Sequence, residues 1–382
     1  MVEHVLPVIQ KLTQDDWFMA RVSACGLFAS AYARLSDEPS KATLRSYFTQ
    51  LCADETPMVK RAASKNVGAF ARVAAAERDV VLAELLPLFH ALAADDQDSV
   101  RLLAIENCTA FAGILGEAEN NKSILPLVKA CALDKSWRVR NSVAREFAPL
   151  ARAMGLAAAA GELLPLFTKL LADPEAEVRA AVARNLAPFA AVVGADRFVS
   201  SVAPQLRELA ADPAPAVRAA AAEGLTDAAV ALPRDAAVAH VVPLVMLCLR
   251  DDAADVRLKA LDNLAKVVDV VGKHFVETDV LPALVALGND ALWRVREKVL
   301  EQIPLLAGQL VSALPEQKQR AARARRRRSS RAATPPRAHR SSSPLSRRAP
   351  PSSRPRSSRC TSRCTPTPST RCAWRPAARS CR

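Results

Sequence analysis

The stretch GELLPLFTKLLADPEAEVRAAVARNLAPFAAVVG (161–194) decides the fold of this chain. Leucine and phenylalanine recur at helical spacing over residues 162–171, with a proline in the first turns, which predicts one amphipathic helix. Glu175 and Glu177 suit the start of a second helix, because acidic groups stabilise helix N-termini. Gly194 is a typical C-terminal stop. The stretch therefore predicts a helical hairpin.

The same pattern recurs along the chain with a period of 39 residues. An Asp stands five residues before a Val-Arg or Val-Lys pair in each copy, and a proline marks most of the first helices. Such hairpins cannot bury their apolar faces alone, but stacked copies form one continuous core. We predict an all-α fold, an α-solenoid of about eight repeats of the HEAT class, whose period is about 40–47 residues. The Asp column is Asp15, Asp54, Asp95, Asp134, Asp173, Asp212, Asp251 and Asp290, and the valine column is Val59, Val100, Val139, Val178, Val217, Val256 and Val295, with Ala20 as a degenerate first member.

The Asp and Arg columns favour a structural interpretation over a binding role. Stacking brings equivalent residues of neighbouring repeats together, so an Asp at one turn can bind the Arg of the next and form a ladder along one edge. We expect this ladder to be partly exposed, and each pair alone should then contribute little stability.

The charge of the chain changes sharply near residue 310. Residues 1–310 hold 33 Lys and Arg against 38 Asp and Glu, whereas residues 311–382 hold 20 basic residues and one acid, Glu316. The second segment contains no Asp, Asn, Gly, Phe, Ile, Met or Tyr, so it cannot bury a core. We predict a solenoid over 1–310 and a disordered tail over 311–382.

Three interpretations of this tail stay open. The preferred one is an out-of-frame translation of GC-rich coding sequence, since Arg, Pro, Ala and Ser dominate the segment. The second is a basic arm that neutralises phosphates and binds nucleic acid non-specifically, because Trp374 is its only aromatic residue. The third is an inert linker or targeting segment, in which Arg325 to Arg328 resembles a nuclear localisation patch.

No constellation of catalytic or metal-binding residues is evident. The sequence lacks the P-loop, H-E-x-x-H and G-x-S-x-G motifs, and its five histidines are isolated. We expect no enzymatic activity, no metal and no cofactor. No apolar run reaches about 18 residues and the start does not resemble a secretory signal, so we expect no membrane span and a cytoplasmic location, with the nucleus as a further one. The body cysteines should be buried and reduced.

Several strings closely resemble the scaffold, or A, subunit of protein phosphatase type 2A, and the resemblance covers about residues 3–310. It implies a HEAT-repeat horseshoe whose intra-repeat turns form a ridge that binds the catalytic subunit together with a regulatory (B-type) subunit. The family's array extends further in both directions, so the resemblance implies that regulatory-subunit binding is kept and catalytic-subunit binding is weakened or lost. The strings are DWFMARVSACGLF (16–28), LCADETPMVKRAASK (51–65), DDQDSVRLLAIENC (95–108), DKSWRVRNSVA (134–144), DPEAEVRAAVA (173–183) and WRVREKVLEQIPLLAGQL (293–310).

The ridge residues that the resemblance implies lie in the turns and the first turn of the second helices. Trp137 and Arg138 also stand on physical grounds, because Trp and Arg dominate interface hot spots and a Trp in a polar turn has no evident core to enter. Packing of the indole over the adjacent turn is the alternative. For Glu55, Asp98 and the two glutamates of the fifth copy, a solvated helix N-terminus is the favoured interpretation. The whole predicted set is Asp16, Trp17, Phe18, Glu55, Pro57, Arg61, Gln97, Asp98, Ser136, Trp137, Arg138, Glu175, Glu177, Trp293 and Arg294.

Two other functions compete with a phosphatase scaffold. One is a nucleic-acid-associated adaptor that uses the solenoid as a dock and the basic tail as an arm. The other is an importin-like transport carrier, which is also built from HEAT repeats. The specific strings favour the phosphatase scaffold over both.

Overall fold

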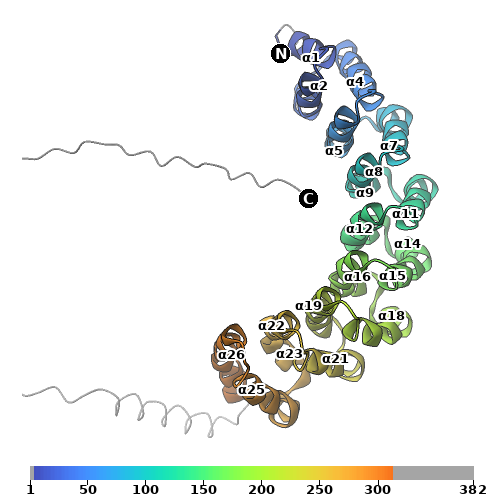
Figure 1. The fold of residues 1–382 in the computed structure, drawn as a ribbon. Helices are drawn as coiled ribbons and strands as arrows, with labels where there is room; N and C mark the ends of the chain where they lie inside the picture. The colour runs from blue at the N-terminus through green and yellow to red at the C-terminus, as the bar shows by residue number, and fades with distance from the viewer. Residues whose placement is uncertain (1–3, 313–382) are drawn as a thin grey trace, which may run out of the picture. The chain divides into compact units, whose positions relative to one another are not determined.

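The computed structural model describes residues 4–312 as helices joined by short turns, with no strand among them (Figure 1). The helices stack as two layers in a curved array, in which the first helix of each repeat lies on the outer side and the second on the inner side (Figure 1). This arrangement confirms the predicted α-solenoid. Residues 313–382, where the three interpretations of the tail fall, lie outside the described residues.

The outer layer contains the first helix of each of the eight copies, and in five copies this helix includes a π-helical turn (η). Its elements are α1 (Val5–Thr13), α4 (Glu38–Cys52), α6 (Arg78–Val80), η1 (Val81–Leu85), α7 (Leu86–Ala93), α10 (Glu117–Glu119), η2 (Asn120–Ile124), α11 (Leu125–Ala132), α14 (Leu156–Ala158), η3 (Ala159–Leu163), α15 (Leu164–Leu171), α18 (Ala195–Ala210), α20 (Arg234–Ala236), η4 (Ala237–Val241), α21 (Val242–Cys248), α24 (Lys273–Phe275), η5 (Val276–Val280) and α25 (Leu281–Leu287).

The inner layer contains the second helix of each copy, which a short turn divides in five of the eight. Its elements are α2 (Phe18–Cys25), α3 (Phe28–Tyr32), α5 (Pro57–Val73), α8 (Asp98–Ile105), α9 (Cys108–Leu115), α12 (Trp137–Arg145), α13 (Phe147–Met154), α16 (Ala176–Ala183), α17 (Leu186–Val193), α19 (Pro215–Ala231), α22 (Ala254–Asp262), α23 (Leu264–Val271) and α26 (Trp293–Ser312).

The first helix of the fifth copy begins at Leu156 and not near residue 162, so the predicted boundary was wrong. The alanines of 157–160 carry no amphipathic stripe and concealed this start. Gly155 precedes the helix with a φ of 89°, a conformation that favours glycine. The π turn η3 then leads into Pro165, which has no N–H and clashes with the carbonyl four residues earlier. A wider turn accommodates that missing bond and the ring.

The second helix of the fifth copy agrees with the sequence at both ends. It begins at Ala176 with Glu175 as its N-cap, and it ends at Val193 before Gly194, whose φ is 87°. Between these ends a turn at Arg184 and Asn185 divides it into α16 and α17. The apolar stripe did not indicate this division.

A buried asparagine near this division joins neighbouring repeats. The Nδ2 atom of Asn185 donates to the carbonyls of Ala181 (3.1 Å) and of Ala144 in the preceding repeat (2.9 Å). Asn107 makes the same contacts two repeats earlier, reaching the carbonyl of Ser64 at 2.8 Å. Each asparagine follows the column valine by seven residues. This second line of polar contacts between repeats was not predicted.

The core runs along the array between the two layers. Phe167 of α15 and Phe189 of α17 stack with ring centroids 4.3 Å apart, and Phe147 of the preceding repeat lies 5.3 Å from Phe189. Aromatic contacts therefore join helices within a repeat and across a junction. The five body cysteines are buried and free, as predicted, and burial raises the pKa of each thiol above its ordinary range. None of the described helices combines the length and apolar character that a membrane crossing requires.

We expect Gly224→Ala to lower the thermal unfolding midpoint. A Cβ at Gly224 of α19 would lie 1.9 Å from the carbonyl oxygen of Ala183, so the junction between α16 and α19 would have to open. Overpacking of this kind typically destabilises by about 1–3 kcal/mol. Gly113→Ala is the matched control, because its Cβ would meet nothing within 4 Å and alanine favours helix. Circular dichroism melts of both variants test this, and equal midpoints would contradict the close contact.

Candidate partner-binding ridge

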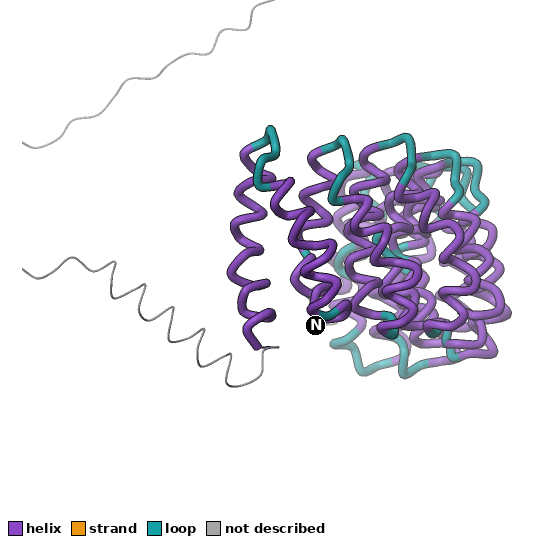
Figure 2. The backbone as a smooth tube through the Cα atoms, turned by 90° about the horizontal axis from the view of Figure 1, so that it is seen from below, coloured by secondary structure: helices purple, strands orange, loops and turns teal. Residues whose placement is uncertain are grey.

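The Asp column builds the turn between the two helices of every copy. One carboxylate oxygen of each Asp accepts the backbone N–H two residues later, at 2.7–2.9 Å in all eight turns. This closed turn holds the chain at the N-cap of the second helix. Figure 2 shows the loops in rows at the two ends of the helices, and these intra-repeat turns form one such row. We call the turns and the two residues after each N-cap the ridge.

The Arg column connects each turn to the next. Arg140 donates from Nε and Nη2 to both carboxylate oxygens of Asp173 in the following repeat, at 2.7 and 3.0 Å. Its Nη1 donates to the backbone carbonyl of Asp134 in its own turn at 2.9 Å. A ladder exists as predicted, but its sense is reversed, because each Arg binds the Asp of the following repeat. The other pairs at 2.6–2.8 Å are Arg21–Asp54, Lys60–Asp95, Arg101–Asp134, Arg179–Asp212, Arg218–Asp251 and Arg257–Asp290.

The ladder is more buried than the sequence suggested. The side chains of Arg140 and Asp173 are 13% and 5% exposed, so water screens their attraction less than that of a surface pair. At Asp212, burial opposes ionisation, but hydrogen bonds from Arg179 and the N–H of Ala214 outweigh it. The pKa of the Asp212 carboxyl therefore lies below its ordinary value.

We expect Asp212→Asn to destabilise the solenoid by about 1.5–3 kcal/mol at pH 7, the range for a hydrogen bond to a charged group. The amide oxygen can still close the turn, so the change mainly removes the ion pair with Arg179. Because the folded-state pKa of Asp212 is lowered, its contribution is present above the ordinary carboxyl pKa of about 3.9 and is lost as the pH falls through the folded-state value.

The measurement is the unfolding midpoint of both chains between pH 7 and pH 3. The difference between them should shrink at the acid end. Glu208→Gln on α18 is the control, since Glu208 is exposed and outside the ladder. A difference that stays constant down to pH 3 would contradict the charge argument.

The predicted tryptophans lie on the ridge and differ in exposure. Trp17 occupies the N-cap of α2 and is 66% exposed, whereas Trp293 begins α26 and is 58% exposed. Trp137 begins α12 and is 38% exposed. It lines a cavity of about 180 Å³ together with Arg138 and Leu102 of the preceding repeat. Part of this indole therefore packs locally, as the alternative held, while the rest stays accessible.

Apart from Arg61, which lies three residues beyond the ridge on α5, the remaining predicted residues also lie on the ridge, and two of them bond to each other. The hydroxyl of Ser136 donates to Asp98 of the preceding repeat at 2.9 Å, which makes both of them connectors between turns. Arg294 lies with its guanidinium 5.7 Å from the centre of the Trp293 ring. Phe18 and Asp98 are half-buried, and the exposed members are Asp16, Glu55, Pro57, Arg61, Gln97, Arg138, Glu175 and Glu177.

The structure adds Met58 to the ridge. Met58 is 46% exposed, and its sulfur lies 3.7 Å from Nη1 of Arg61. It stands four residues after its column Asp, the same place as Arg138 and Arg294 in their turns. This shared position is a signal by which the sequence could have identified it. Side chains at this place point away from the core in several copies and are available to a partner.

The ridge changes charge along its length. Exposed carboxylates occupy the first three turns, at Asp16, Glu55 and Asp96, whereas the fourth turn presents Lys135 and Arg138. A partner that spans these turns needs basic groups at one end and acidic groups at the other. Within residues 4–312 no group of three or more His, Cys, Asp or Glu side chains is placed to hold a metal ion.

Repeated hairpins with closed turns and an exposed ridge define the class of this protein, an α-solenoid of HEAT-type repeats. Two family models match the chain: the PPP2R1A-like HEAT repeat at residues 158–232 and the PIK3R4-like middle domain at residues 1–192. Because the second match spans half of the chain, the chain belongs to the PIK3R4-like middle-domain family.

The curated relatives belong to protein phosphatase 2A. A probable serine/threonine-protein phosphatase PP2A regulatory subunit of Caenorhabditis elegans is 44% identical over 122 residues, which are 32% of this chain and 20% of the relative. The corresponding PP2A regulatory subunit of Schizosaccharomyces pombe is 38% identical over 113 residues, 30% of this chain and 19% of the relative. The PP2A 65 kDa regulatory subunit of Drosophila melanogaster is 53% identical over 74 residues, 19% of this chain and 12% of the relative.

These matches confirm the resemblance to phosphatase 2A scaffold subunits, and the alignments span a fifth or less of each of these relatives. A solved structure in which Kap95p binding alters the switch loops of RanGDP contains a chain of similar fold. It has a TM-score of 0.64 and 13% identity, and the match covers 82% of this chain and 41% of that one. At this identity the likeness shows the fold alone.

Proposed function

We propose that this chain is a scaffold that holds a regulatory (B-type) subunit of protein phosphatase 2A on its ridge. The observation that carries the proposal is the row of uniformly closed turns that present Trp17, Trp137 and Arg138 to solvent. Exposed Trp and Arg on a rigid support are the residues that dominate interface energetics. The names of the relatives support a phosphatase 2A partner in general, since a relative in Dictyostelium discoideum is called the protein phosphatase 2A scaffold subunit, and the choice of a B-type subunit follows from the resemblance of the strings.

The proposal includes a weak or absent hold on the catalytic subunit. Among the described turns, that of the last copy, with Trp293 and Arg294, resembles one that faces the catalytic subunit in the family. One turn offers much less contact area than a specific protein interface, which buries about 800 Å² per partner. The chain itself would perform no catalysis and would work in the cytoplasm or also in the nucleus.

The mechanism of such a scaffold is positional. When two partners bind the same solenoid, the distance between their sites sets the effective concentration of each partner near the other, and no new contact between them is needed. In a solenoid each repeat contacts only its neighbours, so small rotations at many junctions can add up and change the distance between bound partners. The ladder limits those rotations at the ridge edge, because each Arg binds two successive turns.

We expect Trp137→Ala and Arg138→Ala each to weaken binding of a B-type subunit by about ten-fold or more, since hot-spot truncation costs about 2 kcal/mol or more. Arg138→Ala should leave the unfolding midpoint nearly unchanged because the side chain is exposed, whereas Trp137→Ala should lower it modestly because part of the indole packs beside Leu102. Isothermal titration of the purified chain with a recombinant B-type subunit measures the effect. Arg207→Ala on the outer face of α18 is the matched control.

Two outcomes would contradict the proposal. One is that no class of B-type subunit binds the unmodified chain. The other is that the ridge variants and Arg207→Ala have the same affinity, which would place the contact elsewhere on the solenoid.

A further inference from the structure

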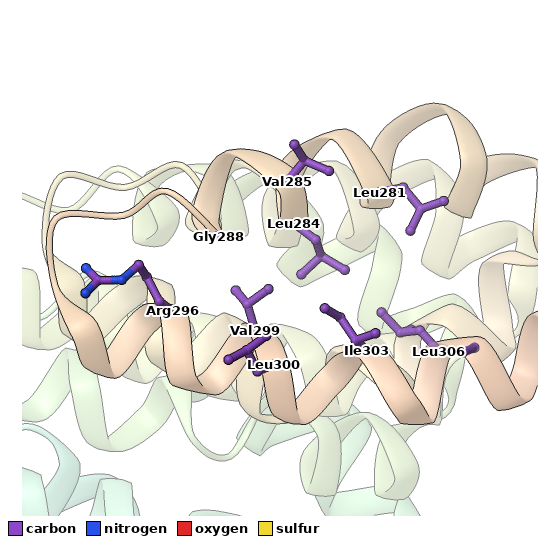
Figure 3. Close-up of a pocket in the computed structure, with 10 residues that line it drawn as sticks. Leu281, Leu284, Val285, Gly288, Arg296, Val299, Leu300, Ile303 and Leu306 are labelled. Carbon is purple, nitrogen blue, oxygen red and sulfur yellow. The ribbon is translucent and has the colours of Figure 1, made fainter. Parts of the chain in front are cut away.

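An apolar groove lies between α25 and α26 at the C-terminal end of the described array. It has a volume of about 540 Å³ and is lined by Leu281, Leu284 and Val285 of α25, and by Leu300 and Ile303 of α26. Figure 3 shows Leu284 of α25 pointing across the groove toward Val299 and Ile303 of α26. Val285 is 69% exposed and Leu300 is 66% exposed, whereas the equivalent residues of the preceding repeat, Met246 and Leu261, are 8% and 0% exposed. The groove is the face on which a further helical hairpin would stack.

Arg296 stands at one end of this groove (Figure 3) with part of its guanidinium unused. Nη1 donates to the carbonyls of Asp290 (2.7 Å) and Ala291 (3.1 Å), as the ladder arginines do in their own turns. In Arg140 and its equivalents the other two nitrogens bind the Asp of the following repeat. Within the described residues, those two nitrogens of Arg296 have no acceptor. The groove is therefore complementary to a helical hairpin that has an apolar face and a carboxylate in its turn.

The first repeat carries the complementary groups. Asp15 closes its turn through the N–H of Trp17, but among the described residues no ladder Arg or Lys binds its carboxylate. Six of the seven later members of its column bind an arginine, and Asp95 binds Lys60. Val8 is 53% exposed on α1, whereas Leu166 and Leu244 at the equivalent place inside the stack are 8% exposed. The first repeat thus presents an apolar face and a free carboxylate oxygen.

Leu27 adds a specific match between the two faces. It occupies the place of Asn107 and Asn185, seven residues after the column position, and is 39% exposed. Those asparagines reach the residue five positions after the valine of the preceding repeat, as Asn185 reaches Ala144. The residue at that place in the last repeat is Leu300. On the first repeat Leu27 thus stands where several other repeats have an asparagine, and its counterpart on the last repeat is Leu300. Two leucines suit an apolar contact in place of a polar one.

From these groups we propose that the chain stacks head to tail, with the first repeat of one copy seated in the C-terminal groove of another. Asp15 of the second copy binds Arg296 of the first and continues the ladder, while Leu27 and Val8 cover the groove. The contact joins two different surfaces, so each copy keeps one free face and further copies can add. This inference does not depend on the proposed phosphatase partner.

The chain's own tail does not fit the groove as well as a second copy does. Residues 313–382 contain no Asp and a single Glu, Glu316. The tail therefore offers one side-chain carboxylate in 70 residues, whereas a second copy offers Asp15 at the matching place of its turn. The many arginines of the tail would also repel that guanidinium.

Sedimentation velocity of the full chain over a range of concentrations tests the proposal. The unmodified chain should form species that grow with concentration. Arg296→Asp blocks one face and Asp15→Asn the other, and each should weaken association by more than about ten-fold. Asp15→Asn keeps an oxygen for the Trp17 N–H, so the first turn still closes. The matched controls are Asp16→Asn and Arg294→Asp, which change neighbouring charges outside the ladder.

A mixture of the two blocked chains is the decisive measurement. The intact groove of Asp15→Asn can accept the intact first repeat of Arg296→Asp, and the resulting pair has no free face left. Equimolar mixing should therefore give a dimer and nothing larger. If Arg296→Asp unfolds the last repeat, Leu300→Glu takes its place, because that side chain is exposed. A chain that stays monomeric at all concentrations overturns the proposal, as does association that the groove variants leave unchanged or a mixture that stays monomeric.

Discussion

The contact between a column Arg and the Asp of the next repeat is the interaction on which the rest of this structure depends. Through Arg140, one guanidinium holds the backbone of its own turn at Asp134 and both carboxylate oxygens of Asp173. The Asp meanwhile closes the next turn through the N–H of Glu175. Three separate requirements, the turn, the start of the second helix and the stacking of repeats, are met by two side chains. The spacing of 39 residues is therefore constrained at the ridge as well as in the core.

A second line of contacts holds the same junctions near the middle of the inner helices. Asn185 bonds carbonyls of two successive repeats, and Gly224 lies so close to the Ala183 carbonyl that no side chain fits between them. Several junctions are thus fixed at two levels, by ion pairs at the ridge and by asparagine bonds or close backbone approach in the core. Among the described residues, the ion pairs between successive outer helices are isolated ones, Arg45–Glu84 and Lys129–Glu162, and five of these helices contain a π turn. Changes in curvature should involve the outer layer more than the inner one, because the inner junctions are tied twice.

The sequence predicted the fold because both helices and their turn repeat the same chemistry, so the Asp and Val columns are visible without any structure. It did not predict the start of the first helix at Leu156, since a run of alanines has no amphipathic stripe. It did not show that Arg140 binds forward to Asp173 rather than backward, because a period of 39 residues places an Asp in both the preceding and the following repeat. The sequence predicted which residues lie on the ridge, but it did not predict how exposed each side chain is. Trp17 and Trp137 lie one position apart in equivalent turns, and only the second one lies against a preceding repeat at Leu102.

The ladder also explains why some ridge positions differ between copies while the column Asp and its basic partner recur in each turn. The closing Asp and the Arg six residues later are committed to structure, and so is the valine between them, which is buried in the core. The N-cap residue contributes its backbone N–H to the turn, so its side chain is not fixed by the fold. The same freedom holds at the place four residues after the Asp, where Met58, Arg138 and Glu177 stand in different copies. The residue directly after the Asp is also exposed in several copies, as at Glu55 and Lys135. Binding specificity on this solenoid is thus confined to the places whose side chains the turn leaves free, because the Asp, the Val and the Arg of each turn have structural tasks.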